Sequence, residues 1–152
     1  MRTITRIIVH HSDGPSAATV ESVRAYHTAP RPRGRGWSDI GYHLVLREDE
    51  ASGWLVEGGR PLAQVGAHDQ GQNEGSIGVC VFGAYSATVA PPPAAWELLV
   101  GLVSGLCRRY GLSAEAVEGH REHEPVGGGT SCPGFDPERL RRAVKATLAR
   151  AA

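Results

Sequence analysis

The sequence predicts an α/β domain in which a sheet is covered by helices, and three observations support this fold class. The chain has 152 residues, the length of one ordinary domain, and such a length can bury a core without disulfides. Short apolar runs alternate with longer segments in which apolar residues recur at helical spacing. No internal repeat is visible, so we expect residues 1–152 to form one domain.

Strands are expected where short apolar runs end at turn residues. The run 76–82, SIGVCVF, is apolar and is closed by Gly83, which is typical of a central buried strand. Similar runs, shorter or less apolar, occur elsewhere in the chain. The predicted strands are the segments 6–9, 42–47, 53–57, 76–82 and 117–119.

Helices are expected between these strands. The first begins after Ser16, whose hydroxyl can cap it, and continues to about His27. The second covers residues 94–110, behind a linker whose prolines suit a first helical turn, and has a broad apolar face. The third begins at Pro137 and carries its apolar residues on one stripe.

Composition excludes several classes of protein. Sixteen basic residues balance sixteen acidic ones, so nothing in the overall charge favours binding to nucleic acid or to a membrane surface. No stretch approaches the roughly 18 apolar residues of a membrane span. The first apolar run is too short for a signal peptide, so we expect synthesis in the cytoplasm without one. Three cysteines fit a reduced compartment, or one thiol used as a ligand, better than a disulfide framework.

Three residues at the ends of predicted strands and loops could hold a metal ion. His10 ends the first strand, His120 follows the strand 117–119, and Cys132 follows a glycine-rich loop. Two imidazoles and a thiolate would leave a fourth position open, as in catalytic zinc sites. Because no short zinc motif is present, spacing alone does not favour a metal site over the alternative that these are three unrelated loop residues.

Six motifs in a fixed order carry a resemblance that covers residues 6–135: IIVHHSDG, GWSDIGYHLVL, EGGRP, VGAHDQGQNEGSIGVCVFG, GHREHEP and TSCPGFD. Together they resemble the zinc-dependent N-acetylmuramoyl-L-alanine amidases of the bacteriophage T7 lysozyme and peptidoglycan recognition protein type. The resemblance implies a single catalytic domain with a central mixed sheet flanked by helices. It also implies hydrolysis of the amide bond between N-acetylmuramic acid and the L-alanine of the peptidoglycan stem peptide.

The same resemblance assigns roles within the site. It makes His10, His120 and Cys132 the ligands of one zinc ion, which activates water and polarises the substrate carbonyl. Tyr42 matches the family's catalytic tyrosine, and Thr130 matches a position that stabilises the oxyanion. A tyrosine that caps the core is the structural alternative for Tyr42, and a buried free thiol is the alternative for Cys132.

Three further residues are expected at the substrate groove. His68 matches a histidine that the family keeps close to the metal, and we expect it to contact substrate rather than the ion. Asn73 would shape the same rim, and Trp37 would line the groove with its aromatic face, although both also fit structural roles. His43 is expected to face away from Tyr42, because successive strand residues alternate.

The segment between His120 and Cys132 leaves one alternative open. His123 is a rival ligand, but the GHRE context matches the family at His120, which we therefore favour. Residues Pro125–Gly129 resemble an insertion between two family motifs. Their glycines tolerate the unusual backbone angles that such a detour needs.

The expected function is that of a phage or prophage endolysin, a monomer without a separate wall-binding domain that reaches the cell wall by holin-type release. A cytosolic amidase that recycles muropeptides is one alternative, and Cys132 argues against it. A peptidoglycan-binding module without activity is another, and the complete set of site residues argues against that. Arg31, Arg33 and Arg35 form a basic loop that is either a solvated segment or a contact with anionic wall polymers.

Overall fold

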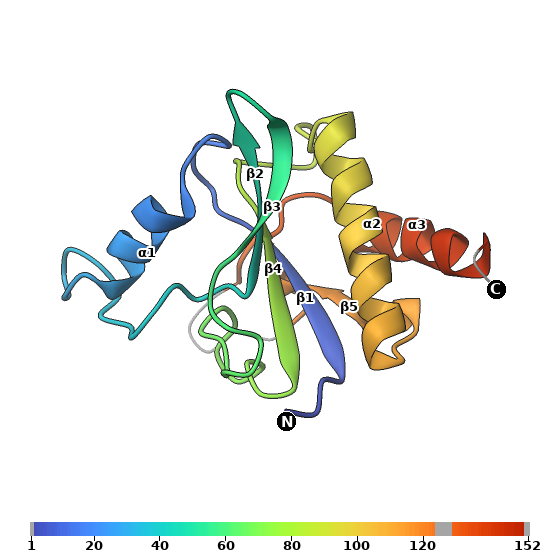
Figure 1. Cartoon of the computed structure of the whole chain (residues 1–152), viewed down its shortest axis with the longest axis horizontal. Coiled ribbons are helices and arrows are strands. Elements are labelled where there is room, and N and C mark those ends of the chain that lie inside the picture. Colours follow the sequence, from blue (N-terminus) through green and yellow to red (C-terminus); the bar gives the residue numbers. More distant parts are fainter. Residues whose placement is uncertain (1, 124–128, 151–152) are drawn as a thin grey trace.

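A five-stranded sheet forms the middle layer of the computed structural model, which describes residues 2–123 and 129–150 (Figure 1). Strand β2 pairs antiparallel with β3 and parallel with β4, and β1 lies parallel to both β4 and β5. The sheet is therefore mixed, which confirms the predicted fold class. Its strands, in spatial order, are β3 (Gly53–Gly58), β2 (Leu44–Asp49), β4 (Ser76–Val81), β1 (Arg6–His11) and β5 (Val117–Gly119).

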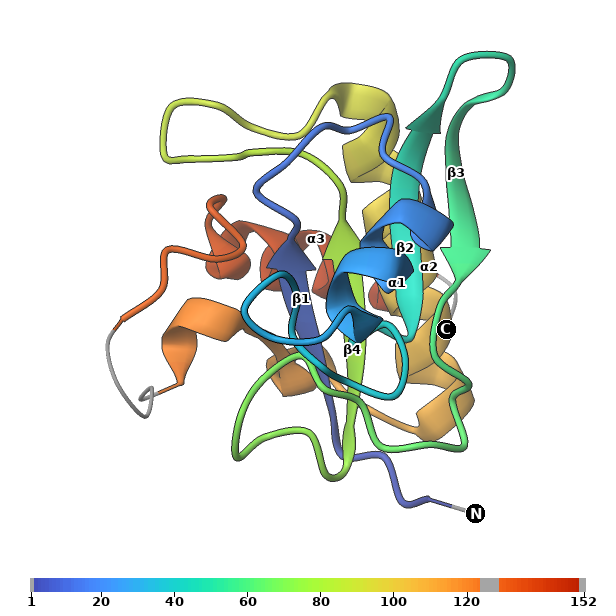
Figure 2. The ribbon, with the colours of Figure 1, turned by 90° about the vertical axis from the view of Figure 1, so that its left-hand side faces the viewer.

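Helices cover both faces of this sheet. Helix α1 (Val20–Thr28) lies over one face, whereas α2 (Pro93–Tyr110) and α3 (Pro137–Arg150) lie over the other (Figures 1 and 2). Two short 3₁₀ turns, η1 (Ala114–Ala116) and η2 (His120–Glu122), flank β5. In the described part of the chain, every helix is too short or too polar to cross a membrane.

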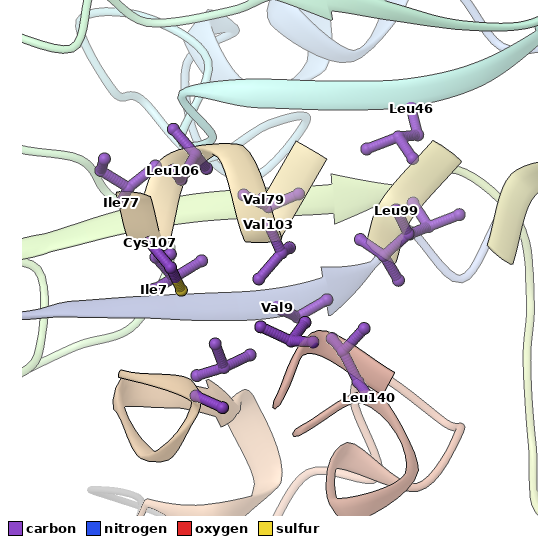
Figure 3. Close-up of a cluster of buried hydrophobic side chains, with 14 of the residues drawn as sticks. Ile7, Val9, Leu46, Ile77, Val79, Leu99, Val103, Leu106, Cys107 and Leu140 are labelled. Atoms are coloured by element: carbon purple, nitrogen blue, oxygen red, sulfur yellow. The ribbon is translucent and has the colours of Figure 1, made fainter. Parts of the chain in front are cut away.

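The face that α2 and α3 cover holds the main hydrophobic core. Ile7 and Val9 of β1 point into it beside their β4 neighbours, because alternate residues of a strand face the same side (Figure 3). Leu99 and Val103 of α2 and Leu140 of α3 close the layer from outside. Burying each such side chain contributes about 1.5–3 kcal/mol, so this face accounts for most of the apolar stabilisation.

The opposite face has fewer apolar residues and holds His10 instead. His10 alternates with Val9 on β1 and pairs in register with Cys80 of β4. Cys80 belongs to a smaller apolar cluster under α1 that includes Val20 and Phe82. Strand alternation thus separates a polar, histidine-bearing face from the main core.

Helix α1 begins later than predicted. Thr19 caps it, because its Oγ1 accepts the Ser22 backbone N–H at 3.1 Å while Ser22 Oγ accepts the Thr19 N–H at 3.2 Å. This reciprocal pair is a capping box. The prediction of Ser16 as the cap was wrong: its hydroxyl donates to Glu48 at 2.7 Å instead.

Candidate metal centre

His10, His120 and Cys132 converge at the carboxyl ends of neighbouring strands. Each brings a ligand atom to within 4.8 Å of those of the other two. The histidines meet because β1 and β5 are parallel with Val9 opposite Gly119, so the next residue of each chain segment is a histidine. Their ring centroids lie 4.7 Å apart, and Cys132 Sγ lies 3.6 Å from His10 Nδ1.

The loop that carries Cys132 is tied to both strand ends. The His11 backbone N–H donates to Cys132 Sγ at 3.4 Å. The Arg121 backbone N–H donates to the Cys132 carbonyl at 2.7 Å. These two bonds hold the thiol against residues that are far from it in sequence, so the sheet and η2 together determine its position.

The protonation states of this group suit a cation. Burial lowers the pKa of His10 well below its ordinary value, so its ring is neutral, the form that binds metals. Burial also lowers the pKa of His120, while the nearby Asp69 carboxylate acts in the opposite direction. Burial raises the pKa of the Cys132 thiol to about 12, so a bound cation would have to displace its proton. Two neutral imidazoles and one thiol are a donor set that fits zinc, with room for a further ligand.

Tyr42 lies beside this centre at the end of the loop before β2. Its ring centroid is 5.3 Å from that of His10 and 5.6 Å from that of His27. Burial holds the pKa of its hydroxyl well above the ordinary value, so Tyr42 keeps its proton and can act as a hydrogen-bond donor.

Thr130 lies two residues before Cys132 in the chain. Its Oγ1 accepts the Cys132 backbone N–H at 3.1 Å. The hydroxyl hydrogen of Thr130 therefore stays available for another acceptor. The oxyanion roles expected for Tyr42 and Thr130 stay predictions.

His68 is buried beside His10 rather than set in an open groove. Only 7% of the residue is exposed. Its Nδ1 lies 3.0 Å from His10 Nε2, and its Nε2 lies 3.3 Å from Ser76 Oγ. Burial lowers the pKa of His68 to about 3, so this ring is neutral too. The structure thus gives His68 a contact with a candidate ligand that the sequence did not predict.

Asn73 and Trp37, the other residues expected at the groove, make contacts of their own. Asn73 Oδ1 accepts the backbone N–H groups of His68 and Asp69 at 2.8 and 3.0 Å, which closes the loop between them. Trp37 is half-buried, and its ring centroid lies 4.8 Å from that of His27 with the two rings tilted by 56°. Their contacts with substrate stay predictions.

His43 does not face away from Tyr42 as strand alternation predicted. Strand β2 begins at Leu44, so residues 42 and 43 lie before it and need not alternate. The His43 ring centroid lies 5.6 Å from that of His68, and its Nδ1 accepts the Gly78 N–H at 2.9 Å. Both rings therefore belong to one histidine-rich cluster.

His123, the rival to His120, is bound by carboxylates on both sides. Its Nδ1 lies 2.5 Å from Asp69 Oδ2 and its Nε2 lies 2.8 Å from Glu118 Oε2. Asp69 Oδ1 lies 3.6 Å from His120 Nε2. Carboxylate oxygens thus occupy both ring nitrogens of His123, so neither nitrogen is free to face a metal ion.

Asp69 and Glu118 were not identified from the sequence. Asp69 is 5% exposed. It directly follows His68, and this position is the one feature of the sequence that could have indicated it as a site residue. Glu118 lies in β5, where a short strand gives no hint of a partner. Of the predicted insertion Pro125–Gly129, residues 125–128 lie outside the described part of the chain.

Comparison with known proteins agrees with this geometry. The endolysin of Klebsiella phage KP32 is 31% identical over an alignment of 141 residues that covers 89% of this chain and 83% of that protein. The endolysin of Escherichia phage T7 is 32% identical over 126 residues, 79% of this chain and 72% of that protein. The solved structure of the N-acetylmuramoyl-L-alanine amidase LysC from Clostridium intestinale URNW superposes with a TM-score of 0.75 at 26% identity, covering 97% of this chain and 87% of that one.

A family model covers most of the chain. The model described as N-acetylmuramoyl-L-alanine amidase matches residues 1–135, which include β1 to β5 and all three candidate metal ligands. The chain therefore belongs to the N-acetylmuramoyl-L-alanine amidase family.

Proposed function

We propose that this chain is a zinc-dependent amidase that hydrolyses the bond between N-acetylmuramic acid and L-alanine of peptidoglycan, and that it acts as a phage-type endolysin. The observation that carries the proposal is the convergence of His10, His120 and Cys132 beside a protonated tyrosine in a member of this family. The KP32 and T7 relatives, both named endolysins, support the second part.

His10, His120 and Cys132 would hold the zinc ion, each through one ring nitrogen or the sulfur. When bound, the ion supplies a Lewis acid that lowers the pKa of water and polarises a carbonyl oxygen. The pKa values of both histidines are lowered, so their rings enter this site neutral and Cys132 is the one ligand that must give up a proton.

Tyr42 and Thr130 would stabilise the charge that develops on the substrate oxygen. Tyr42 keeps its proton because burial raises the pKa of its hydroxyl, so it donates rather than accepts. The Thr130 oxygen already accepts the Cys132 N–H, which directs its own hydrogen elsewhere. Two neutral donors would act without bringing a second cation to the site.

The test is digestion of purified sacculi by the zinc-loaded protein, with mass spectrometry of the released material. We expect free stem peptides that begin with L-alanine, loss of release with a chelator, and its return with added zinc. Tyr42→Phe should bind zinc as the wild type does and lower the rate by about 10²- to 10³-fold, the usual cost of an oxyanion donor.

Other outcomes would identify a different function. Binding to sacculi without peptide release would indicate a recognition module. Release from soluble muropeptides but not from sacculi would indicate a recycling enzyme. We propose further that the protein acts as a monomer and reaches the wall by holin-type release; light scattering, and lysis of cells with and without a co-expressed holin, test these two points.

A further inference from the structure

His68 occupies a slot that two glycines form. A methyl group added at Gly66 would come within 2.5 Å of His68 Cδ2, and one added at Gly78 would come closer still. Gly78 belongs to β4, and Gly66 to the loop that leads to His68. Because a side chain at either position would collide with the ring, the backbone at both glycines restricts where the His68 ring can lie.

Hydrogen bonds at the two ring nitrogens determine which one carries the hydrogen. Ser76 Oγ donates its single hydrogen to the Asn73 carbonyl at 3.0 Å. It can therefore only accept from His68 Nε2, which lies 3.3 Å away. With its hydrogen on Nε2, a neutral His68 presents a lone pair at Nδ1.

The same reasoning extends one residue further, to His10. His68 Nδ1 lies 3.0 Å from His10 Nε2, so His10 must supply the hydrogen of this bond. The lone pair of His10 is then on Nδ1, the nitrogen that lies 3.6 Å from Cys132 Sγ. A chain of hydrogen bonds that begins at the Asn73 carbonyl thus ends at His10, whose Nδ1 lone pair faces Cys132.

We propose that His68 is a positioning residue that fixes the tautomer and orientation of His10, so that Nδ1 faces the metal, and that Ser76 fixes His68 in turn. This inference rests on the proposed zinc site. Metal-binding histidines commonly donate their second N–H to a carboxylate, a carbonyl or water. Here a neutral imidazole would take that role, which adds no negative charge on the His10 side of the site.

The first test is the tautomeric state of the zinc-free protein, measured by ¹⁵N NMR of the imidazole nitrogens. We expect His10 and His68 each to carry hydrogen on Nε2. In Ser76→Ala, His68 loses the acceptor of its N–H and should populate the other tautomer. Hydrogen on Nδ1 of His10 in the wild type would overturn the proposal.

The second test is zinc affinity, measured by competition with a chromophoric chelator. His68→Ala should weaken zinc binding by about 10- to 100-fold, the range seen when such supporting residues are removed. Ser76→Ala should weaken it by a smaller factor. Ser104→Ala is the matched control, because Ser104 is also fully buried but lies in α2 within the main core; it should leave zinc affinity unchanged.

Three results separate this role from the alternatives. Wild-type zinc affinity in both His68→Ala and Ser76→Ala would refute the proposal. A raised KM for His68→Ala with unchanged zinc affinity would make His68 a substrate contact instead. If His68→Ala does not fold, the wild-type spectrum and Ser76→Ala still decide. Zinc bound through His10 Nδ1 without cleavage of sacculi would refute the amidase proposal and leave this inference standing.

Discussion

His10 in β1 and His120, which directly follows β5, are neighbours at the ends of parallel strands, yet their surroundings differ in chemistry. His10 is 1% exposed and contacts a neutral imidazole that two glycines and a serine hold in place. The His120 side chain is 28% exposed and lies beside Asp69, which is paired to His123. Packing thus fixes the position of His10, whereas His120 lies next to the Asp69 carboxylate.

The difference between the two sides has a physical consequence. Packing and neutral hydrogen bonds in a buried slot respond little to salt, because no net charge is involved. The carboxylates beside His120 and His123 carry charge, and salt screens such charge where it is exposed, as at Glu118. We therefore expect the His10 side to be preformed without metal, and the His120 side to depend more on salt.

The largest expected effect separates the two histidines of the charged side. His120→Ala should abolish zinc binding because it removes one of three ligands, whereas His123→Ala should retain zinc because both its nitrogens face carboxylates. Elemental analysis of the purified variants measures this, with Cys132→Ser as a second ligand variant. Zinc retained by His120→Ala and lost by His123→Ala would reverse the assignment.

The neutral side should make folding sensitive to acid. Burial, together with Arg35 and Arg60, lowers the pKa of His27 to about 4. Below about pH 6.5, His27 is protonated in the unfolded chain but stays neutral in the folded chain. The free energy of unfolding therefore falls as the pH drops toward 4, by up to about 3 kcal/mol for this residue.

Urea unfolding at several pH values, for the wild type and for His27→Gln, checks this. Between pH 6.5 and 4, the slope of the free energy of unfolding against pH should correspond to nearly one proton fewer taken up on unfolding for the variant than for the wild type. His27 contacts Trp37 and Tyr42 and also accepts the Gly41 N–H, so the variant is less stable overall and only the slope is diagnostic. Equal slopes would assign the acid sensitivity to other histidines.

A smaller effect is expected from the carboxylates. Asp69→Asn should weaken zinc binding by about tenfold, because the charge next to His120 is lost. Glu118→Gln, which removes a carboxylate that contacts only His123 among the site histidines, should have less effect. The zinc affinities of the wild type and of Asp69→Asn should lie closer together at high salt than at low salt. The same affinity in both variants would show that Asp69 acts only by holding His123.

The smallest effect concerns the basic loop near α1. Arg31, Arg33 and Arg35 are all exposed, and the Arg35 guanidinium lies 5.9 Å from the ring centroid of Tyr26 and 5.8 Å from that of Trp37. Replacing all three arginines by alanine should weaken sedimentation with sacculi a few-fold at low salt, since exposed charges act mainly at long range. Unchanged sedimentation would leave this loop a solvated segment.

Much of the fold was predictable because its signals are local. The apolar runs of β1 and β4, the proline at the start of α2 and the stripe of α3 each lie within one element. Ser16 is a suitable residue type for a cap near a helix start, and residue type alone therefore indicates it. The capping box at Thr19 is recognisable only together with Ser22, three positions later.

The site was predictable only in part. Strand-end positions and family motifs indicated His10, His120 and Cys132, and the structure brings them together. The partner of His10 was not predictable, because the slot for His68 depends on how closely the backbone at Gly66 and Gly78 approaches its ring in the folded chain. His123 pairs with Asp69, which lies 54 residues earlier in the chain, and no local sequence pattern predicts this contact.

The sequence by itself determined the alternation of strands and helices and the identities of the candidate ligands, because hydrophobic periodicity and motif order are written along the chain. Only the tertiary structure decided which nitrogen of His10 faces Cys132 and which carboxylates occupy the two nitrogens of His123. Both depend on hydrogen-bond partners that the parallel pairing of β1, β4 and β5 brings together from distant segments.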